Sequence, residues 1–127
     1  MKGSCLCGAV RYEIHGAARS VVACHCSQCR KTSGHYVAAT QVASADLDVT
    51  GAAALRWFRS SPTAERGFCG TCGSQLFWRP EGRAVISIMA GTLDGPSGLR
   101  LDRQIHVESK GDYYDAPAVP EVDPGAL

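Results

Sequence analysis

Residues 69–73 read Cys-Gly-Thr-Cys-Gly, with two cysteines at the spacing of a metal-binding knuckle, and residues 5–7 read Cys-Leu-Cys. Four thiolates around a tetrahedral ion satisfy zinc completely. Glycines after the cysteines of the knuckle, Gly70 and Gly73, permit its tight turn and a positive φ. The two pairs therefore predict a closed structural zinc site that joins the N-terminal strand to the middle of the chain. Its predicted ligands are Cys5, Cys7, Cys69 and Cys72.

Residues 24–29 read Cys-His-Cys-Ser-Gln-Cys and use the remaining three of the seven cysteines. On an extended backbone Cys24 and Cys26 share one face while His25 points away. Cys29 can then return to the same ion through a turn. Three protein ligands with an open fourth position are typical of catalytic zinc. The seven cysteines thus predict two zinc ions per chain, one structural and one catalytic.

The sequence leaves other uses of this three-cysteine group open. A fourth ligand from His25, His35 or His106 would make it a second closed site. Iron–sulfur clusters also take cysteine ligands, although no spacing of that kind fits the run well. A thioredoxin-type redox pair would sit in a βαβ context, which neither Cys-x-x-Cys pair has.

Composition places the chain among single globular domains. It has 127 residues, is 45% hydrophobic and carries a formal net charge of +1. This near-neutral charge argues against binding nucleic acid through bulk charge, and no apolar run is long enough for a membrane span. The odd cysteine count and the absence of an apolar N-terminal region argue against a secreted disulfide framework. We therefore expect a cytoplasmic protein with no nucleic-acid or membrane partner.

The hydrophobic pattern predicts short strands and no long helix. Strands are expected at 8–14, 20–24, 36–42, 46–50, 54–60, 84–89 and 103–108. One helical turn is expected at 27–32 with Ser27 as its N-cap, and residues 116–127 form a C-terminal tail. The large rings are expected to fill the core; they are Trp57, Phe58, Phe68, Phe77 and Trp78.

The cysteine clusters and their flanking residues resemble the family of glutathione-dependent formaldehyde-activating enzymes, to which the centromere protein V domain also belongs. The matching runs are 3–8 (Gly-Ser-Cys-Leu-Cys-Gly), 24–34 and 68–74. Similar later features are Ile105-His106-Val107, Lys110 and the pair Tyr113-Tyr114. The resemblance implies a mainly β, Mss4-like arrangement of small antiparallel sheets stapled by zinc, with the domain at 1–115.

The resemblance also implies an activity, the condensation of glutathione with formaldehyde to S-hydroxymethylglutathione, classed as a carbon–sulfur lyase for the reverse direction. Cys24, Cys26 and Cys29 would hold the catalytic zinc, which can bind a thiol as thiolate. His25 is a candidate for proton transfer.

Glutathione carries two carboxylates, so its pocket should offer arginine or lysine. Arg30 and Lys31 directly follow the catalytic cluster and are the first candidates. More distant candidates are Arg66, Arg79 and Lys110. The expected partners are thus a small glutathione-like thiol and a small aldehyde. The alternative hypothesis is a non-catalytic two-zinc binding or structural module.

Overall fold

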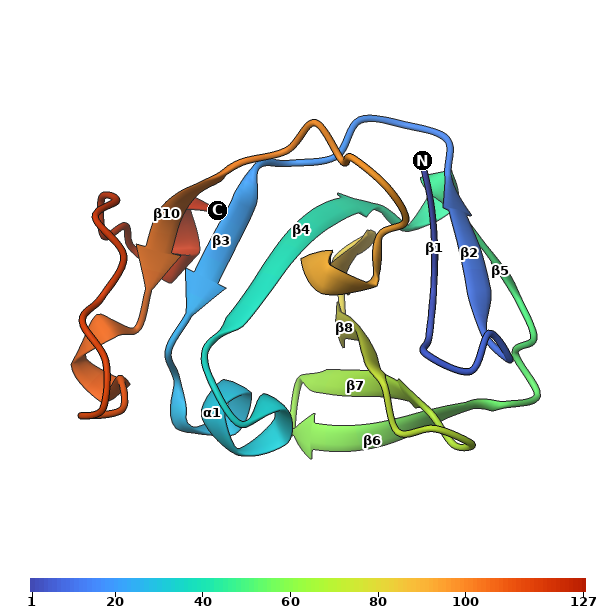
Figure 1. Ribbon diagram of the computed structural model, residues 1–127, viewed down its shortest axis with the longest axis horizontal. Helices are drawn as coiled ribbons and strands as arrows, with labels where there is room; N and C mark the ends of the chain where they lie inside the picture. Colours follow the sequence, from blue (N-terminus) through green and yellow to red (C-terminus); the bar gives the residue numbers. More distant parts are fainter.

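The computed structural model describes residues 1–127 and consists mainly of short β-strands, as predicted (Figure 1). The strands are β1 (Lys2–Ser4), β2 (Arg11–Ile14), β3 (Val21–Cys24), β4 (Val37–Ala43), β5 (Leu47–Thr50), β6 (Leu55–Ser61), β7 (Ala64–Cys69), β8 (Gln75–Pro80), β9 (Val85–Met89) and β10 (Leu101–Ile105). The one α-helix is α1 (Ser27–Ser33), and the 3-10 turns are η1 (Ser44–Asp46), η2 (Ala90–Thr92), η3 (Val107–Ser109) and η4 (Pro124–Ala126). None of the helices is both long and apolar enough to cross a membrane.

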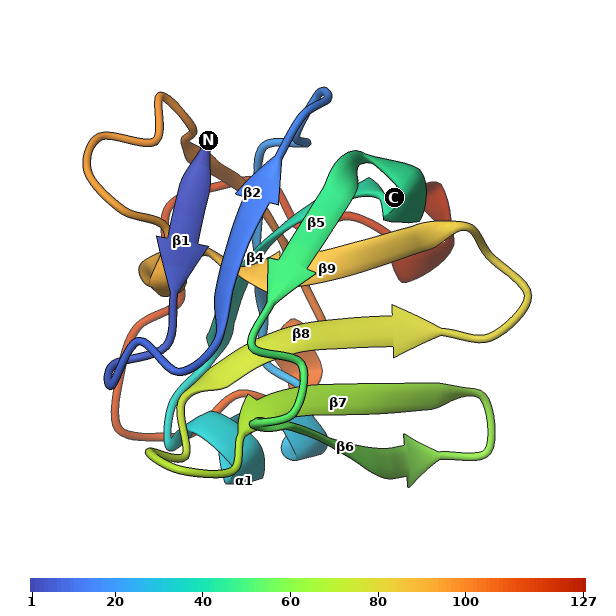
Figure 2. The same cartoon turned by 90° about the vertical axis from the view of Figure 1, so that its right-hand side faces the viewer.

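The strands form two sheets. The larger sheet has seven strands in the order β10-β3-β4-β9-β8-β7-β6, and the smaller has three in the order β1-β2-β5. All pairings are antiparallel except that of β10 with β3. Figure 2 shows the three-stranded sheet lying in front of β4 and β9 of the larger sheet. The main hydrophobic core lies between the two sheets.

Strand β2 supplies one side of this core by the alternation that the sequence predicted. Tyr12 and Ile14 of β2 and Val10, which directly precedes the strand, are buried, while Arg11 is exposed. The ring of Tyr12 meets that of Phe77 edge-on at 5.5 Å between centroids. The core residues are Cys5, Val10, Tyr12, Ile14, Val42, Cys69, Leu76, Phe77, Ile86 and Ile88.

Strand register gives the larger sheet two different faces. One row of paired residues, which includes Ile88 and Phe77, faces the three-stranded sheet; we call this the core face. The next row runs Gln41–Ser87–Trp78–Arg66 across β4, β9, β8 and β7 and points to the opposite side, the cavity face. Successive residues of a strand point to opposite faces, so the two rows are separated by the thickness of the sheet.

The strand expected at 8–14 begins only at Arg11, most other boundaries shift by one residue, and two differences have a clear local cause. The N-cap of α1 is Cys26 and not Ser27, because the Cys26 Sγ accepts a hydrogen bond from the backbone N–H of Cys29 at 3.3 Å. The last strand is Leu101–Ile105 and not 103–108, because His106 adopts a left-handed conformation with φ of 57° that ends it. Strands β1, β7 and β8 were not predicted. β1 has only three residues, and charged residues interrupt β7 and β8, so none of them shows a clear alternation of apolar and polar residues.

The expectation that all five large rings fill the core is wrong for Phe58. Phe77 is 1% exposed and stacks on Trp57 at 6.2 Å, but Phe58 is 61% exposed. Trp57 faces the core, so its neighbour Phe58 must face the other side of edge strand β6, where no further strand covers it. Trp78 lies on the cavity face.

Residues 116–127, expected to form a tail, lie along β10. The backbone N–H of Gln104 donates to Pro120 O at 3.0 Å, and that of Val122 donates to Gln104 O at 2.9 Å. Glu121 pairs with Gln104 in a parallel bridge. The segment therefore covers the outer edge of the larger sheet.

The contrast between the two phenylalanines gives a test of the core. Phe77→Ala is expected to lower the free energy of unfolding by about 3–5 kcal/mol, because it removes a fully buried ring. Phe58→Ala, its matched control, should change it by less than about 0.5 kcal/mol. Urea denaturation at fixed zinc concentration measures both. Equal losses for the two variants would contradict the assignment of the core face.

Candidate metal centres

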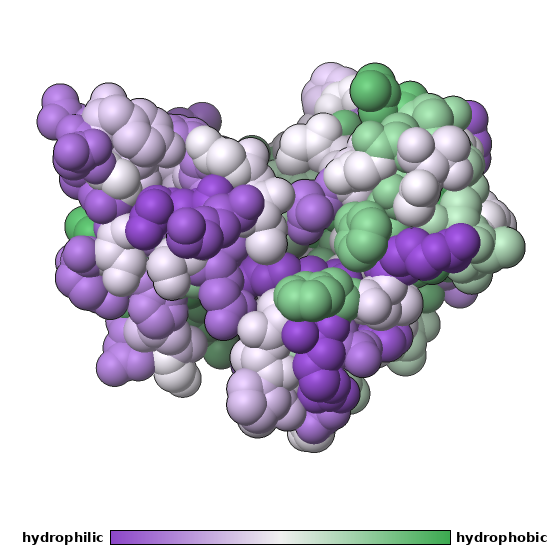
Figure 3. Space-filling view, turned by 90° about the horizontal axis from the view of Figure 1, so that it is seen from below, coloured by the Kyte–Doolittle hydropathy of each residue, from purple (hydrophilic) through white to green (hydrophobic).

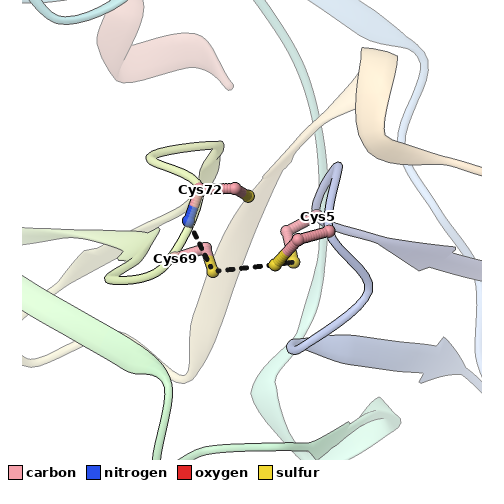
Figure 4. Close-up of side chains that lie close together, drawn as sticks. Cys5, Cys69 and Cys72 are labelled. Carbon is pink, nitrogen blue, oxygen red and sulfur yellow. Dashed lines mark hydrogen bonds between the residues drawn. The ribbon is translucent and has the colours of Figure 1, made fainter.

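Four cysteine sulfurs converge where the two sheets meet. Cys5 and Cys7 come from the loop between β1 and β2, and Cys69 and Cys72 come from the end of β7 and the turn before β8. Figure 4 shows the two hairpins presenting their sulfurs to one another. The Sγ atoms of Cys5 and Cys7 are 3.6 Å apart, those of Cys7 and Cys69 are 3.8 Å apart, and all four lie within 4.8 Å of one another. Tetrahedral zinc with Zn–S bonds of about 2.3 Å spaces its sulfurs about 3.8 Å apart, so this group fits such an ion.

Three of these four sulfurs, those of Cys5, Cys69 and Cys72, receive hydrogen bonds from neighbouring groups. Cys5 Sγ accepts from the backbone N–H of Val10 at 3.3 Å, and Cys69 Sγ accepts from the backbone N–H groups of Thr71 and Cys72 at 3.4 and 3.5 Å. The hydroxyl of Ser74 lowers the pKa of Cys72 to about 5. Donors favour the charged form of an acceptor, so the chemistry of this donor set suits a cation.

The glycines of the knuckle serve different purposes. Gly73 has φ of 79°, as the sequence predicted. Gly70 does not have a positive φ; instead, a Cβ there would lie 2.9 Å from Arg56 Cγ and 3.2 Å from Ala54 O. Gly70 is thus required by the close approach of the neighbouring chain.

A second group unites the other three cysteines. Cys24 ends β3, Cys26 caps α1 and Cys29 lies in its first turn. Cys26 has extended backbone angles, φ of −62° and ψ of 158°, so Cys24 and Cys26 turn to the same side. The three sulfurs lie within 4.8 Å of one another, and no histidine or carboxylate joins them. The group therefore could hold a metal with three protein ligands.

Without a cation between them, three thiolates at this short spacing would repel one another. Hydrogen bonding with the sulfurs of Cys24 and then Cys29 lowers the pKa of Cys26. The sulfurs of Cys26 and then Cys29, together with burial, raise the pKa of Cys24. Three thiolates at this spacing require a metal ion between them, which the donor set fits.

The three-cysteine group opens onto a cavity of about 460 Å³ on the cavity face. Trp78 and Met89 supply apolar walls, Arg66 lies on the sheet, and Arg19 and Arg83 lie nearer the surface. No aspartate or glutamate side chain lines it. Figure 3, seen from below, shows a mainly hydrophilic surface on the side of β10 and hydrophobic groups on the side of the three-stranded sheet. The cavity can therefore receive an anionic molecule with some apolar surface.

The sequence profile of the glutathione-dependent formaldehyde-activating enzymes matches residues 1–109. The chain belongs to this family. It is also similar to an uncharacterized lyase of Schizosaccharomyces pombe (strain 972 / ATCC 24843), with 30% identity over 118 residues that make up 90% of this chain and 83% of that protein. Among solved structures, a crystal structure of a Rhodobacter sphaeroides protein is 28% identical, with a TM-score of 0.60 over 96% of this chain and 100% of that one.

In this member of the formaldehyde-activating family, His25 lies away from the cavity. It is fully buried, with Nδ1 2.5 Å from the hydroxyl of Tyr114 and Nε2 3.0 Å from Gln104 Oε1. The amide nitrogen of Gln104 already donates to Pro117 O and Val119 O. The oxygen of Gln104 must then accept from His25 Nε2–H, so Nδ1 accepts from Tyr114. Through these hydrogen bonds His25 connects the segment that carries Cys24 and Cys26 to Tyr114 and, by way of Gln104, to residues 116–127.

The other candidate residues divide between the cavity and the surface. His35 is exposed, with Nδ1 2.8 Å from the Tyr113 hydroxyl, while His106 lines the cavity without joining the sulfurs. Arg30 and Lys31 do not line it: Arg30 Nε donates to Ser109 O at 3.0 Å, and Lys31 is exposed on α1.

The arginines that line the cavity come from segments distant in sequence. Arg19 is held in place by a hydrogen bond from its Nη2 to Ala39 O at 3.2 Å. Only strand pairing brings Arg66, a distant candidate in the sequence, beside the cysteines. Arg19 and Arg83 carried no sequence signal, because each lies in an ordinary loop.

The two cysteine groups are expected to differ in what they stabilise. If both groups hold zinc, Cys69→Ser should remove the ion between the sheets and abolish cooperative unfolding, because such an ion contributes about 10–16 kcal/mol in isolated peptides. Cys26→Ser should lose only the other zinc and keep the fold. Native mass spectrometry counts zinc ions per chain, and circular dichroism follows unfolding. If Cys26→Ser unfolds as badly as Cys69→Ser, the assignment of the two roles is wrong.

The buried histidine makes a separate prediction. His25→Ala leaves Gln104 Oε1 without its donor and is expected to lower the free energy of unfolding by about 1–3 kcal/mol. His35→Ala, at an exposed position between α1 and β4, is the control and should have little effect. Urea denaturation of the zinc-loaded proteins measures the difference. Equal stability of the two variants would show that His25 does not connect the segment that carries Cys24 and Cys26 to residues 116–127.

Proposed function

We propose that this protein condenses a small, glutathione-like thiol with formaldehyde or a related small aldehyde, and catalyses the reverse carbon–sulfur cleavage. One observation carries the proposal: the three-cysteine group opens onto a cavity whose charged side chains are all basic. Membership of the formaldehyde-activating family and similarity to a protein named a lyase support it.

We propose that both cysteine groups hold zinc and that their roles differ. Cys5, Cys7, Cys69 and Cys72 offer four sulfurs between the sheets and would hold a structural ion. Cys24, Cys26 and Cys29 would hold the second, leaving one position free. A zinc ion bound there would supply a thiolate-binding and carbonyl-polarising centre.

The reaction needs no further reactant. The sulfur–carbon bond forms as the carbon–oxygen π bond opens, and the thiol proton ends on the new hydroxyl oxygen. The contribution of the chain is therefore to bind both partners, orient them and exclude water. Trp78 and Met89 form the apolar part of the cavity wall, which limits water around the reacting sulfur.

Arg19 and Arg83 are proposed as the recipients of the thiol's carboxylates. Both line the cavity, and the backbone hydrogen bonds of Arg19 hold its guanidinium at the rim. Arginine binds carboxylates through two parallel hydrogen bonds. We propose them in place of Arg30 and Lys31, which lie outside the cavity. His25 lies between Cys24 and Cys26 in the chain and is proposed as a positioning residue, because its hydrogen bonds hold the backbone that carries both cysteines.

Exchange NMR of the glutathione–formaldehyde equilibrium tests this function. The zinc-loaded protein should accelerate formation of S-hydroxymethylglutathione above the uncatalysed rate, and Cys26→Ser should abolish the acceleration while remaining folded. Arg83→Gln should raise KM for glutathione by about 10-fold, because a charge-assisted pair is worth about 1.5 kcal/mol or more, but leave KM for cysteamine unchanged. Cysteamine has no carboxylate.

The opposite results separate the two hypotheses. If the folded, two-zinc protein does not accelerate the reaction with either thiol, the enzyme proposal fails and the non-catalytic two-zinc module replaces it. If Arg83→Gln affects both thiols equally, Arg83 does not recognise carboxylates.

A further inference from the structure

Arg66 is a buried cation without a carboxylate partner. It is 6% exposed and lies on the cavity face of β7, between Phe58 of β6 and Trp78 of β8. None of the ion pairs in the protein includes it. Its Nε is buried and has no hydrogen-bond acceptor. An arginine stays charged at all accessible pH values, so this charge requires compensation from another source.

The neighbouring atoms of Arg66 identify that source. Its Nη2 lies 3.7 Å from Cys29 Sγ and 3.4 Å from Gln28 Oε1. The amide oxygen of Gln28 is neutral, so the sulfur of Cys29 is the partner that can carry negative charge. A buried charge is tolerated when it is paired and is strongly unfavourable when it is not.

The charges match in number. Three thiolates on a divalent ion carry a net charge of −1, and Arg66 carries +1. We propose that Arg66 is a positioning residue for the metal of the three-cysteine group: its guanidinium neutralises that net charge and so holds the ion in the protein. This inference rests on the proposed zinc site at Cys24, Cys26 and Cys29.

The four-cysteine group shows why the second site needs such a partner. Backbone N–H groups donate three hydrogen bonds to the sulfurs of Cys5 and Cys69, and Cys7 is exposed to water. In the three-cysteine group, the backbone N–H of Cys29 donates to the Cys26 sulfur, whereas the donor that reaches the Cys29 sulfur is the guanidinium of Arg66. Arg66 supplies the positive charge that amides and solvent supply at the other site.

Strand pairing makes the position of Arg66 rigid. Strand β7 pairs with β6 on one side and β8 on the other, so its backbone cannot shift alone. The backbone from which the guanidinium reaches Cys29 is therefore fixed, and the side chain is buried. A charge held in place in advance stabilises its partner without reorganisation.

Chelator competition tests this inference. Arg66→Met keeps the length and apolar stem of the side chain but removes the charge. The dissociation constant of the second zinc is measured at pH 7.5 with a chromogenic chelator, and cobalt(II) replaces zinc in a parallel titration followed by thiolate charge-transfer absorption. The zinc of the four-cysteine group is the internal reference for a folded chain.

The expected result is that Arg66→Met weakens binding of the second zinc by about 10–100-fold, the range found when residues that support metal ligands are removed. Arg66→Lys should recover part of the loss, because it restores a positive charge. Arg59→Met, on neighbouring strand β6, is the matched control and should match the unsubstituted protein, because Arg59 is engaged in surface ion pairs with Glu65 and Glu81.

Two results would overturn the inference, and they are distinguishable. If the unsubstituted protein binds two zinc ions and Arg66→Met binds the second one within twofold as tightly, Arg66 does not hold the metal and the proposed function is unaffected. If the unsubstituted protein binds only the zinc of the four-cysteine group, the proposed catalytic site fails and this inference fails with it.

Discussion

The approach of Cys7 to Cys69 is the contact on which the rest of the structure depends. The two residues are 62 positions apart, and their sulfurs lie 3.8 Å from each other. This approach fixes the three-stranded sheet on the larger one and sets Tyr12 against Phe77 in the core between them. Closing so long a loop costs conformational entropy, and a metal held by four sulfurs can offset it in a chain whose main core has ten buried residues.

With one face of the larger sheet covered in this way, the other face is free to form a site. The alternation of side chains that buries Phe77 necessarily turns Trp78 to the opposite side. The same alternation places Arg66 next to Trp78 across the strands. The core and the cavity are thus two consequences of one strand register, and a one-residue slip would destroy both.

Electrostatics distinguishes the two cysteine groups more than ligand spacing does. The four-cysteine group is satisfied by backbone N–H donors and by water around Cys7. The three-cysteine group lies beside a basic cavity and a buried guanidinium. In the proposed roles, the site with three protein ligands and positive surroundings would exchange an anionic fourth ligand, whereas the site with four protein ligands would keep its ion.

The sequence alone determined the division of the seven cysteines into four and three and the mainly β class, because ligand spacing and alternation are local properties. It also predicted that His25 points away from Cys24 and Cys26, because neighbours on an extended backbone face opposite sides. Only the tertiary structure decided which charged side chains meet the cysteines. Arg30 and Lys31 are adjacent to them in sequence but lie outside the cavity, whereas Arg66 reaches Cys29 through strand pairing across 37 residues. Long-range register, which no local pattern encodes, determines such contacts.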